Sequence, residues 1–176
     1  WYITGHLHAD NKDRYGFQAT FFRYAIKPDA TAGSAAFGSD HIFMAHMAFS
    51  DINREDFYHE ERLNRDGWDA YCSTEKMDMQ NGNWTLAQDE SYEMDLYATI
   101  QENVEMNLRL KPAKPHVTFG ENGLSTKGAE RSACSWYITY PRLQITGDIV
   151  LNEKKVPVSG EAWMDHEISS SQLSKT

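Results

Sequence analysis

The sequence predicts a single, nearly all-β domain in which about ten short antiparallel strands form a barrel or a sandwich. Three observations favour this class. Apolar and polar residues alternate with period two along most of the chain, aromatic residues make up 12% of it, and turn-forming residues separate the alternating runs. A length of 176 residues suits one hydrophobic core. We therefore expect residues 1–176 to form one domain.

Period-two alternation marks the strands in chain order. The expected strands are Trp1–Leu7, Tyr15–Ala25, Ile42–Phe49, Phe57–Leu63, Trp84–Ala87, Tyr92–Thr99, Val104–Leu110, Ser135–Tyr140, Leu143–Val150 and Val156–Asp165. Asn81-Gly82 supplies a hairpin turn, whereas the prolines in 111–115 cannot continue a ladder and mark a connection at the rim. Residues 27–39 are rich in small and polar residues and form a loop long enough to act as a lid.

The charge and apolar content of the chain exclude some partners. Acidic residues number 26 and basic residues 17, which gives a net charge of -9. Because no basic stripe interrupts this acidity, nucleic acid and anionic membrane surfaces are poor partners. No apolar run approaches the roughly 18 residues of a membrane-spanning helix. We therefore expect neither a nucleic-acid partner nor a transmembrane segment.

The common catalytic and metal-binding motifs are missing from the sequence. It contains no nucleophile elbow, dinucleotide-binding loop, phosphate-binding loop or metalloprotease helix, so we expect no cofactor. His6 and His8 could share a metal, but no third ligand follows, and we expect no metal site. Cys72 and Cys134 permit a disulfide without requiring one, and unpaired thiols are favoured. His46 lies in the most apolar strand, where it is either a hydrogen-bonded core residue or an acid–base group in a pocket.

The stretch 160–167 is the most informative part of the sequence. In a strand, Glu161, Trp163, Asp165 and Glu167 point to the same side. Three carboxylates on one face indicate either a solvated surface or a wet cavity, because a dry core would not tolerate them. In a largely apolar cavity, burial and repulsion would raise the pKa of one carboxyl group and make it a proton donor. Both interpretations remain open at this point.

Several segments together resemble the AttH/CrtC-like family. They are Trp1–Leu7, Gly16–Arg23, Ala45–Asp51, Glu61-Arg62, Lys127-Gly128, Ser135–Leu143 and Val158–Glu167. The resemblance covers nearly the whole chain. The family includes carotenoid 1,2-hydratases, which are also called hydroxyneurosporene synthases, as well as predicted secreted hydrolases and fungal pericyclases.

The resemblance implies a lipocalin-like, calycin-type antiparallel barrel of about 8–10 strands around an apolar ligand pocket. It also implies that residues 1–176 are the amino-terminal half of a longer two-barrel protein. The implied ligand is a small hydrophobic molecule of the isoprenoid, polyene or polyketide class, and the implied partner is a second barrel or another copy of the chain. The secreted members favour a periplasmic or extracytoplasmic location, with a cytoplasmic one left open.

The resemblance also implies a set of site residues. Asp165 follows an aromatic residue by two positions, as does the aspartate that protonates the double bond in the hydratases, and it is the expected catalytic acid. The expected ligand-binding residues are Trp163, Trp136, Tyr140, His46, Phe21 and Glu167. The histidine that assists in the hydratases has no counterpart in 135–140, so this sequence departs from the full hydratase pattern.

Three functions are compatible with these residues. The first is an enzyme, a hydratase-like hydro-lyase or a pericyclase-type cyclase, with Asp165 as its proton donor. The second is a non-catalytic carrier of hydrophobic ligands, and the third is a structural half-domain that packs on a second barrel. The fold alone does not decide among them.

Overall fold

The computed structural model describes residues 1–25, 41–67, 69–128 and 133–171, and its regular elements are all strands. They are β1 (Tyr2–His8), β2 (Arg14–Ala25), β3 (His41–Asp51), β4 (Asp56–Arg65), β5 (Ala70–Cys72), β6 (Asp78–Asn81), β7 (Trp84–Gln88), β8 (Met94–Ile100), β9 (Val104–Pro112), β10 (Val117–Thr118), β11 (Leu124–Thr126), β12 (Cys134–Leu151) and β13 (Lys154–Ser171). This content confirms the predicted all-β class. The lid predicted at 27–39 lies outside the described residues.

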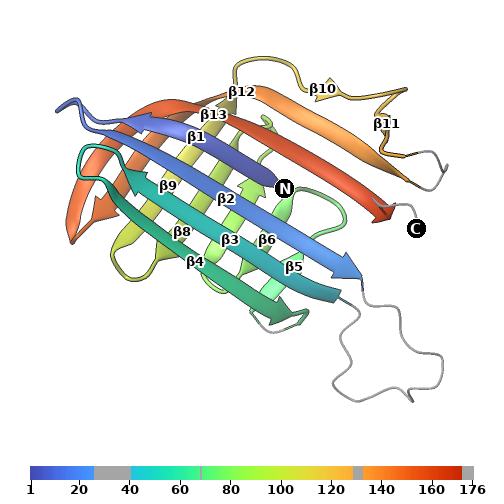
Figure 1. The fold of residues 1–176 in the computed structure, drawn as a ribbon, viewed down its shortest axis with the longest axis horizontal. Helices are drawn as coiled ribbons and strands as arrows, with labels where there is room; N and C mark the ends of the chain where they lie inside the picture. Colours follow the sequence, from blue (N-terminus) through green and yellow to red (C-terminus); the bar gives the residue numbers. More distant parts are fainter. Residues whose placement is uncertain (26–40, 68, 129–132, 172–176) are drawn as a thin grey trace.

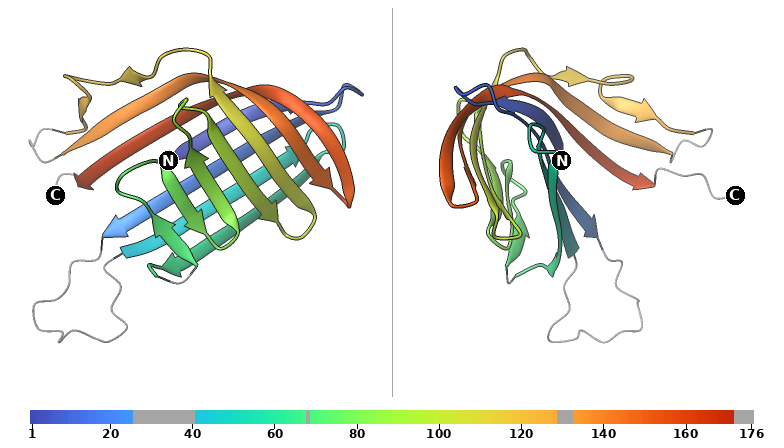
Figure 2. Two further views of the ribbon diagram at one scale, coloured as in Figure 1. Left: turned by 180° about the vertical axis from the view of Figure 1, so that it is seen from behind. Right: turned by 60° about the vertical axis from the view of Figure 1, so that its left-hand side comes forward.

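One antiparallel sheet contains all of these strands and curls almost into a closed barrel (Figure 1). The strand order is β4-β3-β2-β1-β13-β12-β9-β8-β7-β6-β5, with β10 and β11 added along β12. Views from other sides show β5–β8 crossing in front of β1–β4, so the two ends of the sheet face each other (Figure 2). In the described part of the chain, no helix is long and apolar enough to cross a membrane.

The barrel closes between β4 and β6–β7 through side chains rather than through a backbone ladder. The Arg62 side chain reaches from β4 to the carbonyl oxygen of Asn81 and the side chain of Asn83. Its guanidinium lies 3.9 Å from the centroid of the Trp84 ring. Asn64 Nδ2 donates to Asn81 Oδ1 at 2.6 Å. We call this junction the seam.

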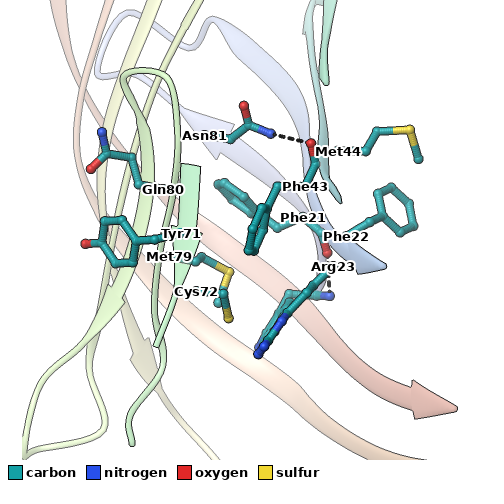
Figure 3. Close-up of a pocket in the computed structure, with 11 residues that line it drawn as sticks. Phe21, Phe22, Arg23, Phe43, Met44, Tyr71, Cys72, Met79, Gln80 and Asn81 are labelled. Carbon is teal, nitrogen blue, oxygen red and sulfur yellow. Dashed lines mark hydrogen bonds between the residues drawn. The ribbon is translucent and has the colours of Figure 1, made fainter. Parts of the chain in front are cut away.

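Alternate strand residues fill the barrel interior, as the period-two pattern predicts. The largest completely buried side chains include those of Trp84, Phe49, Ile3 and Leu96. At one end of the barrel, Phe21 and Phe43 face Met79 across a cavity of about 10 Å³ (Figure 3), which has room for about one water molecule. Side chains therefore fill the described interior around this cavity.

β12 and β13 differ most from the expected strands. The sequence predicts two strands, Ser135–Tyr140 and Leu143–Val150, but β12 contains both in one strand of 18 residues. A register shift between Tyr140 and Leu143 accommodates Pro141 and Arg142 as a bulge, which is where a sheet tolerates proline. β13 also extends to Ser171, beyond the predicted end at Asp165.

Candidate functional site

β12 and β13 form a long two-stranded ribbon with two distinct faces. Ala162 and Met164 of β13 point into the barrel core, and we call their side the inner face. Glu161 and Trp163 alternate with them on the outer face, where they are exposed. Past the barrel, the ribbon continues together with β10 and β11 as a projection that we call the arm (Figures 1 and 2).

The ribbon separates the predicted site residues into two groups. Trp163, Asp165 and Glu167 lie on the outer face, as the sequence predicts for alternate residues of one strand. Tyr140 pairs with Met164, and Trp136 pairs with Ile168, which puts both aromatic residues on the inner face. The predicted residues of β12 and β13 therefore do not line one pocket.

The two remaining predicted residues lie away from the ribbon's outer face. Phe21 belongs to the barrel core and is 4% exposed. His46 lies on the outer face of β3, in one cross-strand row with Thr20, Tyr2 and Asp165. Three strand spacings separate His46 from Asp165, or about 14 Å. His46 contacts the ring of Phe22 edge-on instead.

On the outer face, Asp165 has two hydroxyl neighbours from β12. The hydroxyl of Thr139, which is completely buried, donates to Asp165 Oδ1 at 2.5 Å. Tyr137 also hydrogen-bonds with Asp165, and burial together with this negative charge raises the pKa of the Tyr137 phenol. Tyr137 therefore stays protonated at neutral pH and acts as a hydrogen-bond donor.

Glu167 extends this group of polar side chains along the ribbon. The hydroxyl of Ser135 donates to Glu167 Oε1 at 2.5 Å, and Lys127 Nζ lies 2.6 Å from the same oxygen. Although burial acts in the opposite direction, the hydrogen bonds from Lys127 and Ser135 lower the pKa of Glu167. Lys127 also lies 4.8 Å from the ring centroid of Tyr137. Glu167 is therefore an ionised partner of Lys127 at neutral pH, which suits it poorly to donate a proton.

Aromatic rings border this polar group on the outer face. Trp163 and Tyr2 are 39% and 38% exposed, respectively, and Tyr2 pairs with Asp165 across β1 and β13. Phe119 stacks on Tyr137 with ring centroids 4.8 Å apart. A carboxyl group held by two hydroxyls is thus accessible beside aromatic rings, an arrangement that can donate or accept a proton next to an apolar ligand.

Four residues of this group were not predicted: Lys127, Ser135, Tyr137 and Thr139. The last three alternate along β12, and their period could have been read from the sequence. Their pairing with Asp165 and Glu167 depends on the register of β12 against β13, which local sequence does not specify.

Metal-binding and thiol chemistry find little support in the described residues. They contain no group of three or more His, Cys, Asp or Glu side chains that could hold a metal ion. His6 and His8 are both exposed on β1, and Cys72 and Cys134 are free thiols.

Comparisons with known proteins relate this chain to one family. A family model described as AttH-like matches residues 1–176. The crystal structure of a protein assigned as AttH from Nitrosomonas europaea superposes with a TM-score of 0.85 at 33% identity, covering 98% of this chain and 51% of that one. Kievitone hydratase from Nectria haematococca superposes with a TM-score of 0.73 at 12% identity, covering 97% and 48%. The chain thus spans about half the length of each structure, and no curated protein sequence matches it.

Proposed function

Because this chain belongs to the AttH-like family, we propose that it is a lipocalin-like domain that binds a long apolar ligand on the outer face of the β12–β13 ribbon. The ligand class is an isoprenoid, polyene or polyketide. The observation that carries the proposal is the half-buried Asp165 carboxyl, held by Thr139 and Tyr137 and bordered by exposed aromatic rings. The packed barrel core supports an external site.

We further propose that Asp165 catalyses the addition of water to a carbon–carbon double bond. In its protonated form, which it reaches by taking a proton from solvent, the Asp165 carboxyl gives that proton to one alkene carbon. The cation that forms on the other carbon lies over the faces of Trp163 and Tyr2. Water then bonds to the cation and returns a proton to Asp165, so the net change is the gain of one water molecule. A hydratase with a similar fold supports hydration as a reaction that this fold is compatible with.

The hydroxyl partners of Asp165 have a defined role in this reaction. Thr139 and Tyr137 hydrogen-bond to the carboxylate that remains after proton transfer, which favours the transfer. General acid catalysis of this kind contributes about 10²- to 10⁴-fold to a rate. Thr139→Val should therefore slow hydration while leaving the binding of the apolar ligand largely unchanged, because it removes a hydroxyl that the ligand does not contact.

The test compares two carboxylates on the same face of the same strand. Asp165→Asn should abolish hydration of prenol and carotenoid substrates, measured by mass spectrometry as the gain of one water molecule. It should leave unchanged the midpoint of thermal unfolding and the quenching of tryptophan fluorescence by the ligand. Glu161→Gln is the matched control, because Glu161 is exposed and pairs with Arg142. Equal losses in both variants, or unfolding of Asp165→Asn, would show that Asp165 is not the acid.

The arm favours a second function, the docking of another barrel of the same fold. Its exposed apolar side chains are Val117, Phe119, Leu124, Trp136 and Ile168, which are 38–58% exposed. Apolar residues on both faces of one projection are typical of an interaction site. In the absence of that barrel we expect the chain to self-associate through the arm, and Ile168→Glu should restore a monomer. A wild-type chain that stays monomeric in sedimentation velocity at high concentration would contradict this function.

A further inference from the structure

A groove of about 780 Å³ lies at the end of the barrel, against Tyr140 on the inner face of β12. Its other walls are the residues just before β8 and the connection that follows β9, and its lining residues are Ser91, Tyr92, Glu93, Lys111, Pro112, Ala113, Lys114, Pro115, His116 and Tyr140. The β12 strand separates this groove from Asp165. It is therefore a different site from the one proposed above.

The connection that forms one wall of the groove is fixed at both of its ends. The backbone N–H of Ala113 donates to the carbonyl oxygen of Arg142 at 2.9 Å, and Val117 pairs with Thr139. Between these points, Pro112 and Pro115 restrict the backbone further. A wall held in this way is preformed, so a ligand would lose little affinity to the ordering of the protein.

The groove offers flat rings to a ligand. Tyr92 is 66% exposed, and the His116 ring lies 5.9 Å from the Tyr140 ring, tilted by 52°. Gln88 Nε2 donates to the Tyr140 hydroxyl at 3.5 Å, which leaves the hydroxyl hydrogen available to an acceptor. The volume lies within the range of about 300–1,000 Å³ that is typical of small-molecule sites.

The charge in the groove is opposite in sign to that of the whole protein. Glu93 is its one acidic lining residue, and it is already bound by Lys111 Nζ and Arg109 Nε, each at 3.0 Å. Lys114 forms no ion pair within residues 1–25, 41–67, 69–128 and 133–171. An exposed lysine with no acidic partner among the described residues, beside aromatic rings in a chain of net charge -9, favours an anionic ligand with an apolar body.

We propose that this groove binds an amphipathic organic carboxylate. The flat unsaturated or aromatic body of the ligand lies between Tyr92 and Tyr140, and its carboxylate pairs with the Lys114 ammonium. The inference does not depend on the proposed chemistry at Asp165, because the two sites lie on opposite faces of the ribbon and share no residue.

The test uses parinaric acid, a fluorescent polyene carboxylate, and its neutral methyl ester. The acid should bind saturably, and the ester about three- to fivefold more weakly, as expected for the loss of one solvent-exposed ion pair. Lys114→Gln should weaken the binding of the acid about three- to fivefold and leave that of the ester unchanged. Tyr92→Ala should weaken the binding of both. Lys154→Gln, in the β12–β13 hairpin, is the matched control and should change neither.

Four results would overturn the inference. Three are the absence of saturable binding, equal affinities for the acid and the ester, and an unchanged affinity in Lys114→Gln; the fourth comes from a variant of the outer face. Trp163→Ala separates the two sites, because it affects ligands on the outer face only. If Trp163→Ala rather than Tyr92→Ala weakens parinarate binding, the ligand occupies the outer face and the groove is not its site. Loss of hydration in Asp165→Asn with normal parinarate binding would support two separate sites, because the groove would bind its ligand independently of Asp165.

Discussion

Replacing Arg62 with alanine removes one of the side chains that join β4 to β6 and β7 at the seam, leaving the hydrogen bond of Asn64 to Asn81 in place. The Arg62 side chain is 21% exposed, so its contact with the buried Trp84 ring is shielded from water, whereas its hydrogen bond to Asn83 lies at the surface. Stacking on Trp84 is worth about 1–2 kcal/mol at such a site, and the hydrogen bonds to Asn81 and Asn83 add about 1 kcal/mol each. The side-chain entropy regained on unfolding offsets part of this sum. We expect Arg62→Ala to lower the free energy of unfolding by about 3 kcal/mol.

Urea denaturation followed by circular dichroism measures this change directly. In a chain of this size, a loss of about 3 kcal/mol corresponds to a midpoint roughly 6–12 °C lower in a thermal melt. Arg142→Ala is the matched control, because Arg142 pairs with Glu161 where both side chains are about half exposed, and such pairs are worth at most about 1 kcal/mol. If Arg62→Ala is no more destabilising than Arg142→Ala, the seam does not depend on this side chain.

Three further predictions concern stability and thiol reactivity. A Cβ at Gly160 would lie 1.9 Å from the carbonyl oxygen of His6, whereas one at Gly16 would have no neighbour closer than 3.9 Å. In urea denaturation, Gly160→Ala should therefore lower the free energy of unfolding by about 3 kcal/mol, and Gly16→Ala should lower it by less than about 1 kcal/mol. Burial lowers the pKa of His166 from 6.5 to about 4, so the folded state binds fewer protons between these values. The contribution of His166 to the free energy of unfolding should be fully present above pH 6.5 and decrease by at most about 1.4 kcal/mol per pH unit as the pH falls toward 4. In urea titrations at several pH values, His166→Gln should not show this decrease. Burial raises the pKa of the Cys72 thiol, so Cys72 in the folded chain should react with iodoacetamide at pH 8 more slowly than in the urea-unfolded chain, and equal rates would contradict this.

The sequence predicts the long strands well because their burial pattern is local. β1 alternates strictly over its seven residues. β2 and β3 alternate over most of their length, although Thr20 is buried between two core residues of β2. β5, β6, β10 and β11 were not predicted, and they have only two to four residues each. Strands this short depend on the neighbour they pair with, and sequence pattern alone does not name that neighbour.

The candidate site also combines features that the sequence determines with features that depend on the pairing between strands. The sequence by itself determined that Trp163, Asp165 and Glu167 share one face, because adjacent side chains of any strand point in opposite directions. It could not determine which residues of β12 join them. The bulge after Tyr140 adds an extra residue to β12 and so reverses the side toward which odd-numbered positions point. Only the tertiary structure decided that Thr139 faces Asp165 while Tyr140 faces the groove, because register is fixed between strands and not within one.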